Sequence, residues 1–90
     1  MNKGELIDAV AESTGLSKAE AGNAVDATLG AITDSLKNGN TVTLVGFGSF
    51  NVKHREARVG RNPRTNEPLQ IAARNVPGFK AGKALKDAVN

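Results

Sequence analysis

The first residues of the chain have the spacing of an amphipathic helix. Its apolar positions fall on one side and are Leu6, Ile7, Val10 and Ala11. Asn2 is a suitable N-cap residue, and Glu5 follows it at the distance of a capping box. Gly15 is suited to the left-handed conformation that often ends a helix. The pattern therefore predicts a short helix over residues 2–14.

A second and longer helix is predicted directly afterwards. Ser17-Lys18-Ala19-Glu20 matches the S-x-x-E capping box. The apolar positions that follow are spaced by three or four residues and are Ala21, Val25, Leu29, Ile32 and Leu36. The helix is expected to end near Asn38-Gly39-Asn40, which is a turn signal. With a rise of about 1.5 Å per residue, it should be about 30 Å long.

The hydrophobic period then changes to that of a strand. Residues 41–45 are rich in β-branched side chains and alternate in polarity, which predicts a strand. Residues 46–48 predict a turn, and a return strand is expected to begin over residues 49–52. A last helix is predicted over residues 82–89. Three lysines recur every three residues and are expected to fall along one side, namely Lys80, Lys83 and Lys86.

Residues 53–75 differ in composition from the rest of the chain. They contain two acids, Glu56 and Glu67, against six basic residues, Lys53, Arg55, Arg58, Arg61, Arg64 and Arg74. Turn residues near the middle predict two strands that meet at a tip. Neither strand has a continuous apolar face, and an isolated hairpin is marginally stable in water. We therefore expect a flexible arm that becomes ordered against a partner, with an ordinary disordered loop as the alternative.

Length and composition limit the classes of protein. Ninety residues allow a single domain, with residues 1–52 and 76–90 as a dimerisation body and residues 53–75 as the arm. The absence of cysteine excludes disulfides, thiolate nucleophiles and zinc fingers. No apolar run is long enough to span a membrane, so a soluble, intracellular protein is expected.

The body is small for a stable monomer, because a short chain buries a small fraction of its surface. The long second helix also has little else in the chain to cover it. We therefore predict a symmetric dimer with Phe47, Phe50 and Phe79, the only aromatic residues, near a shared core. The sequence leaves open whether a paralogous chain replaces one copy in a heterodimer.

The net charge of +3 conceals a division between the two halves of the chain. Residues 1–50 carry three lysines and six acids, whereas residues 51–90 carry nine basic and three acidic residues. This asymmetry suggests a polyanion partner for the basic half, although a solvated basic surface accounts for it about equally well.

Few residues are suited to catalysis. The single histidine, His54, lies between Lys53 and Arg55, whose charges make it a poor general base, so it is interpreted as an exposed arm residue that faces phosphate. The acids show no metal-ligand spacing. Gly46-Phe47-Gly48 resembles the start of a phosphate-binding glycine motif, but Asn51 occupies the third glycine position. The sequence therefore predicts no enzyme, no cofactor and no metal site.

Binding of double-stranded DNA is the function that the arm favours. Its basic side chains can neutralise phosphates. A strand of about ten residues reaches about 33 Å, close to the turn of B-DNA at about 34 Å. The arm has no aromatic side chain on which unpaired bases could stack, which argues against single-stranded partners. Pro63 at the tip either shapes the turn or enters a base step as a wedge, and the residues alone favour the turn.

These residues together resemble the signature of the bacterial HU and integration host factor proteins, and HU more closely. The residues that carry the resemblance are Gly46-Phe47-Gly48-Ser49-Phe50, Arg55, Arg58, Gly60, Arg61, Asn62, Pro63 and Thr65, and the similarity extends over all 90 residues. The resemblance implies an α+β fold, an intertwined dimer with a helical body, a three-stranded antiparallel sheet and one protruding β-ribbon arm per chain.

The resemblance also implies a histone-like architectural protein of the bacterial nucleoid, in the cytoplasm. A homodimer is expected to bind DNA through the minor groove with little sequence specificity, to bend and compact it, and to prefer nicked, gapped or distorted DNA, with Pro63 as the wedge. The expected DNA-binding residues are Lys3, Lys53, Arg55, Arg58, Arg61, Asn62, Pro63, Arg64, Arg74, Lys80, Lys83 and Lys86. A sequence-specific DNA-bending factor, a basic protein-interaction module and secondary RNA binding are alternatives.

Two positions depart from the family pattern. Asn66 stands where glycine is common, and it is expected to preserve the tip turn because Asn tolerates the left-handed conformation. Ala72 stands where proline is common and is expected to leave that strand of the arm looser.

Overall fold

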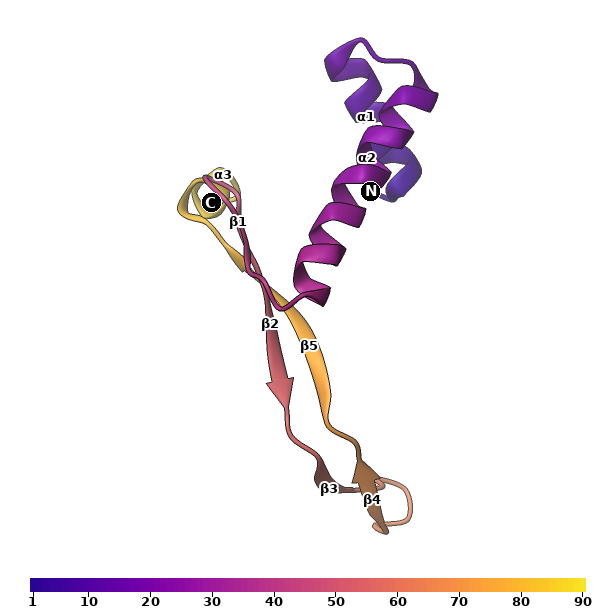
Figure 1. The fold of residues 1–90 in the computed structure, drawn as a ribbon, viewed down its shortest axis with the longest axis vertical. Coiled ribbons are helices and arrows are strands. Elements are labelled where there is room, and N and C mark those ends of the chain that lie inside the picture. Colours follow the sequence, from indigo (N-terminus) through magenta and orange to yellow (C-terminus); the bar gives the residue numbers. More distant parts are fainter. The chain divides into compact units, whose positions relative to one another are not determined.

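The computed structural model describes all 90 residues, which form three helices and five strands (Figure 1). In chain order they are α1 (Lys3–Thr14), α2 (Lys18–Lys37), β1 (Val42–Leu44), β2 (Gly48–Arg55), β3 (Arg58–Arg61), β4 (Pro68–Ile71), β5 (Arg74–Ala81) and α3 (Lys83–Ala88). The predicted α+β class is confirmed. The chain divides into a helical unit, Met1–Ser35, and a ribbon unit, Leu36–Asn90. No helix combines the length and the apolar character needed to cross a membrane.

Both predicted helix starts are confirmed by their capping hydrogen bonds. The Glu5 backbone N–H donates to Asn2 Oδ1 at 2.8 Å. At the start of α2, the Glu20 N–H donates to Ser17 Oγ at 3.1 Å and the Ser17 N–H donates to Glu20 Oε1 at 3.2 Å. This reciprocal pair satisfies two donors that a helix start otherwise leaves without partners. Gly15 ends α1 with φ of 75°, the left-handed conformation that was expected.

The apolar side chains of the helical unit are only partly covered. Ala21 and Val25 are its buried residues, at 0% and 7% exposure. Leu6 and Leu29 remain 37% and 47% exposed. A shallow groove of about 250 Å³ opens beside them and is lined by Leu6, Val10, Ala24, Val25, Thr28 and Leu29. The helical unit therefore leaves an apolar surface in contact with water.

The ribbon unit contains the expected three-stranded antiparallel sheet, and its strand order is β1-β2-β5. The turn before β2 covers residues 45–47, one residue earlier than predicted, and Gly48 already belongs to the strand. Gly48 is buried because the neighbouring strand approaches it closely. A Cβ built at this position would lie 2.5 Å from the Lys80 carbonyl oxygen and 2.6 Å from the Phe79 ring.

The three phenylalanines gather on one face of this sheet. The Phe79 ring lies 4.8 Å from that of Phe50 and 5.5 Å from that of Phe47, measured between centroids, and both pairs are tilted. Phe47 and Phe79 are nevertheless 47% and 45% exposed. The three rings therefore form a cluster within one chain, and the outer surface of this cluster faces water.

The β2–β5 ladder continues into the segment predicted as the arm. Lys53 pairs with Val76, His54 with Asn75 and Arg55 with Arg74. An antiparallel ladder requires only paired backbone groups, so the polar side chains here do not end it. The two-stranded sheet of β3 and β4 follows after two short breaks, residues 56–57 and 72–73. These breaks are made of glutamate and alanine, both of which have low β-propensity.

The ribbon unit places β3 and β4 at the end of β2 and β5 that is opposite to α3 (Figure 1). No residue between 53 and 75 is buried, so the segment does not fold into the interior. The predicted last helix is confirmed as α3, which carries Lys83 and Lys86, and Lys80 lies before it on β5.

Candidate nucleic-acid interface

One face of the β2–β5 ladder is cationic. Residues directly opposite in an antiparallel pair lie on the same face, and alternate residues of a strand share that face. Lys53 and Arg55 of β2 therefore share a face with Arg74, the partner of Arg55. Lys80 belongs to the same face because it pairs with Ser49, which lies four residues before Lys53 on β2 and therefore on the same side of the strand. All four basic side chains are exposed.

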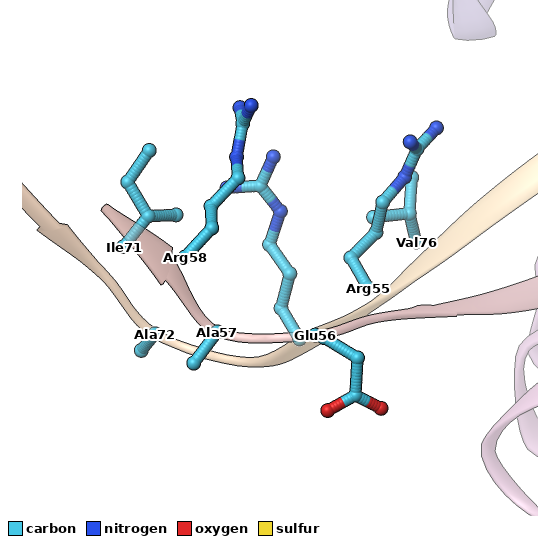
Figure 2. A pocket seen from close by; sticks show the side chains of 8 residues that line it. Arg55, Glu56, Ala57, Arg58, Ile71, Ala72 and Val76 are labelled. Atoms are coloured by element: carbon cyan, nitrogen blue, oxygen red, sulfur yellow. The ribbon is translucent and has the colours of Figure 1, made fainter. Parts of the chain in front are cut away.

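The cationic face continues across the break into β3. Arg55 and Arg58 point to the same side of the ribbon as Ile71 and Val76, whereas the Glu56 carboxylate points to the opposite side (Figure 2). The four side chains on the first side border a pocket of about 500 Å³. Its full lining is Arg55, Glu56, Ala57, Arg58, Ile71, Ala72, Arg74 and Val76. The pocket combines guanidinium groups with aliphatic side chains, which suits the phosphate and sugar of a nucleic-acid backbone.

The tip of the arm is an ordered turn. The Arg64 N–H donates to Asn62 Oδ1 at 2.9 Å, and the Asn66 N–H donates to the Asn62 carbonyl at 2.7 Å. Asn66 has φ of 60°, which confirms the expected left-handed conformation. The Arg61 guanidinium donates to the Asn66 carbonyl at 3.2 Å through Nη1. Pro63 lies inside this turn and is exposed, so the turn presents its ring to solvent.

The remaining predicted contacts lie outside the arm. Lys83 and Lys86 are exposed on α3, and Lys83 Nζ lies 3.6 Å from Asp87 Oδ2. Lys3 belongs to the helical unit and pairs with Asp26. A phosphate that approaches Lys3 therefore competes with this carboxylate.

The arm arginines have no carboxylate partners in the structure. The ion pairs of the chain are Lys3–Asp26, Lys18–Asp8, His54–Glu56 and Lys83–Asp87, and none includes an arginine. The guanidinium groups from Arg55 to Arg74 are thus available to an external anion, apart from the single bond of Arg61 to the tip.

Two features of this region were missed by sequence reasoning. The aliphatic side of the arginine pocket was not expected, although Ile71 and Val76 are visible in the sequence. His54 was interpreted as facing phosphate, but its ring contacts Asn75 and Glu56 instead. Asn75 lies 21 residues away along the chain, so no local pattern could have indicated the contact.

The chain is a small α+β protein. It combines a helical unit with a ribbon unit whose antiparallel strands carry exposed basic side chains. A family model described as bacterial DNA-binding protein matches residues 1–90. DNA-binding protein HU-beta of Pseudomonas aeruginosa is 62% identical over 90 residues, which is the whole of both chains. The chain belongs to this bacterial HU family of DNA-binding proteins.

Solved structures of HU proteins have the same fold. An Anabaena HU–DNA cocrystal structure matches with a TM-score of 0.90 and 50% identity, over 99% of this chain and 97% of that chain. HU from Thermotoga maritima matches with a TM-score of 0.72 and 39% identity, over the full length of both chains.

Proposed function

We propose that this chain is a histone-like architectural protein that binds double-stranded DNA in the bacterial nucleoid. It acts as a homodimer, contacts the minor groove with little sequence specificity, and bends and compacts the duplex. It prefers nicked, gapped or already distorted DNA, because bending such DNA requires less energy than bending an intact duplex. The chain performs no catalysis in this role.

The observation that carries the proposal is the unpaired cationic face at the root of the arm. Arg55 and Arg74 lie directly opposite each other, and both are exposed without a carboxylate partner. Like charges in directly opposed positions destabilise a sheet. A phosphate between or beside them relieves this repulsion, and the release of condensed counterions adds to the affinity.

The arm geometry supports a minor-groove contact. A narrow minor groove attracts arginine side chains, and an inserted apolar ring unstacks a base step. Arg61, Asn62 and Arg64 surround Pro63 at the exposed tip, and the tip turn is held by its own hydrogen bonds. A preformed turn can present the proline ring without first being ordered by the DNA.

The homodimer is supported by apolar side chains that each unit leaves exposed. In the helical unit these line the groove beside Leu6 and Leu29, and in the ribbon unit they are Phe47 and Phe79. A second copy of the same chain would bury them, as expected for an obligate dimer with residues 1–52 and 76–90 as its body. Residues 53–75 then serve as the DNA-binding arm of each subunit.

A binding series tests the proposal. Affinity is measured by fluorescence anisotropy over a range of salt concentrations, on intact, nicked and gapped duplexes of one sequence and on matched random sequences. The proposal expects a steep salt dependence, tighter binding to the gapped duplex and similar affinities among sequences.

Other outcomes identify other functions. Equal affinity for intact and gapped DNA contradicts the wedge, and strong preference for one sequence indicates a sequence-specific bending factor. Tighter binding to an RNA duplex of the same sequence, measured in a parallel series, makes DNA the secondary partner. DNA retention that persists in the Arg58→Glu, Arg61→Glu double variant shows that the arm serves another purpose, such as binding an acidic protein.

A further inference from the structure

His54 connects three parts of the ribbon at the point where β2 ends. Its Nδ1 lies 2.9 Å from Asn75 Oδ1 on β5, and its Nε2 lies 3.1 Å from Glu56 Oε1, the first residue of the break before β3. We call His54, Asn75 and Glu56 the His54 clamp. It is the one side-chain connection in the structure from the three-stranded sheet to the break that precedes β3.

The His54 clamp lies on the face of the ribbon opposite to the arginines. His54 and Asn75 are opposite each other in the ladder, one position before Arg55 and one position after Arg74, so they occupy the other face. The Glu56 carboxylate also points away from Arg55 and Arg58 (Figure 2). Lys53 and Arg55, the sequence neighbours of His54, belong to the cationic face. Glu56 is therefore the charged group that His54 contacts.

The position of this carboxylate matters because Glu56 is flanked by arginine along the chain. It lies one residue from Arg55 and two from Arg58, and its side chain is 85% exposed. If Glu56 turned to the other face, it would compete with phosphate for the arginine side chains. We propose that His54 is a positioning residue, which holds Glu56 away from the cationic face and so keeps these arginines available to DNA.

The contacts of the His54 clamp depend on whether the His54 ring is protonated. Asn75 Oδ1 and the Glu56 carboxylate are both acceptors, so the contacts need an N–H on both ring nitrogens, and only the imidazolium has both. The neutral ring loses one partner unless the Asn75 amide turns over to donate to Nδ1. The imidazolium therefore holds both partners and attracts the Glu56 carboxylate by its charge, whereas the neutral ring offers this carboxylate at most a neutral hydrogen bond.

The inference rests on the proposed DNA-binding function, and a double-mutant cycle tests it. His54 is the only histidine, so a pH effect that disappears in the His54→Gln variant belongs to this ring rather than to the N-terminal amine. Binding to a gapped duplex is measured between about pH 5.5 and pH 8. The proteins are the unsubstituted chain and the variants His54→Gln, Glu56→Gln and the two together.

We expect the unsubstituted chain to bind about two- to fivefold more tightly at the lower pH, the size of effect that an exposed ion pair allows. The Glu56→Gln variant should bind tightly at both pH values, and His54→Gln should then have little further effect. If His54→Gln caused the same loss of affinity with and without the Glu56→Gln substitution, His54 would contribute only its charge, and the proposal would be overturned.

A second measurement does not depend on DNA. The side-chain amide resonances of Asn75 should shift along the same titration curve as the His54 ring protons. Amide resonances that stay constant through the titration contradict the clamp. Absence of DNA binding by the unsubstituted chain at every pH contradicts the proposed function instead, and the resonance experiment still decides whether the clamp exists.

Discussion

Arg55 and Arg74 face each other across the last rung of the β2–β5 ladder. Neither has a carboxylate partner, and both border the pocket at the root of the arm. The free protein thus keeps two like charges at a position where a neutral pair would be more stable. A neutral pair at this rung would favour the stability of the fold, whereas two arginines favour the binding of an anion.

Replacing Arg74 by glutamine should separate these two effects. The repulsion is removed, so we expect the free energy of unfolding to rise by about 0.2–1 kcal/mol. DNA affinity should fall, and the slope of log K against log salt should decrease by about 1 for each arm. Thermal unfolding and anisotropy titrations measure the two effects. The control is Lys37→Gln, the same loss of charge at the end of α2, which should leave the salt slope unchanged.

The Pro63→Ala variant tests the wedge at the tip. The turn is held by Asn62 and Asn66, so the arm should keep its structure. The preference for gapped over intact DNA should decrease by about tenfold, or about 1.4 kcal/mol, because a methyl group unstacks a base step less effectively than a pyrrolidine ring. Pro68→Ala, at the start of β4, is the matched control. An unchanged preference in Pro63→Ala would leave the proline with a role in the turn alone.

The left-handed Asn66 predicts different results for two small substitutions. With φ of 60°, Asn66→Ala should destabilise the turn by about 1–2 kcal/mol, whereas Asn66→Gly should be tolerated. The tip makes few contacts with the rest of the chain, so the change should appear in local amide exchange and not in the midpoint of thermal unfolding. Faster exchange in both variants would point to the loss of a side-chain contact instead of backbone strain.

Gly48 should be intolerant of any side chain. The Cβ of Gly48→Ala would lie 2.5 Å from the Lys80 carbonyl, a backbone atom that cannot move without shifting β5. We expect a loss of about 1–3 kcal/mol in chemical denaturation. Gly30 in α2 has nothing within 4 Å of the same built atom, so Gly30→Ala should stabilise the protein by up to about 1 kcal/mol.

The capping box of α2 predicts a pH dependence of stability. The hydrogen bond from the Ser17 backbone N–H holds the pKa of Glu20 below its ordinary value, and a smaller contribution comes from the Ser17 side chain. Because the pKa of this carboxyl is lower in the folded than in the unfolded protein, its contribution to stability is fully present at pH values above the unfolded-state pKa. The contribution is lost as the pH falls through the folded-state pKa. In acid titrations followed by circular dichroism, the Glu20→Gln variant should lose less stability on acidification than the unsubstituted chain. Ser17→Ala should cost about 1 kcal/mol at neutral pH.

The sequence by itself determined the features that depend on neighbours along the chain. The caps at Asn2 and Ser17 use bonds between residues three apart, and the tip turn uses bonds within five residues. These need only local geometry, which residue type controls. The charge division and the exposed basic arm also follow from composition, because residues 53–75 lack an apolar face.

The tertiary structure alone decided how the strands are paired. Register selects which side chains share a face, and both faces of the arm root are too polar for a hydrophobic pattern to specify it. The ladder therefore extends to Arg55 and Arg74, and it places His54 opposite Asn75. The pairings at the arm root join residues about 20 apart, and the backbone ladder that creates them is independent of the side chains it brings together.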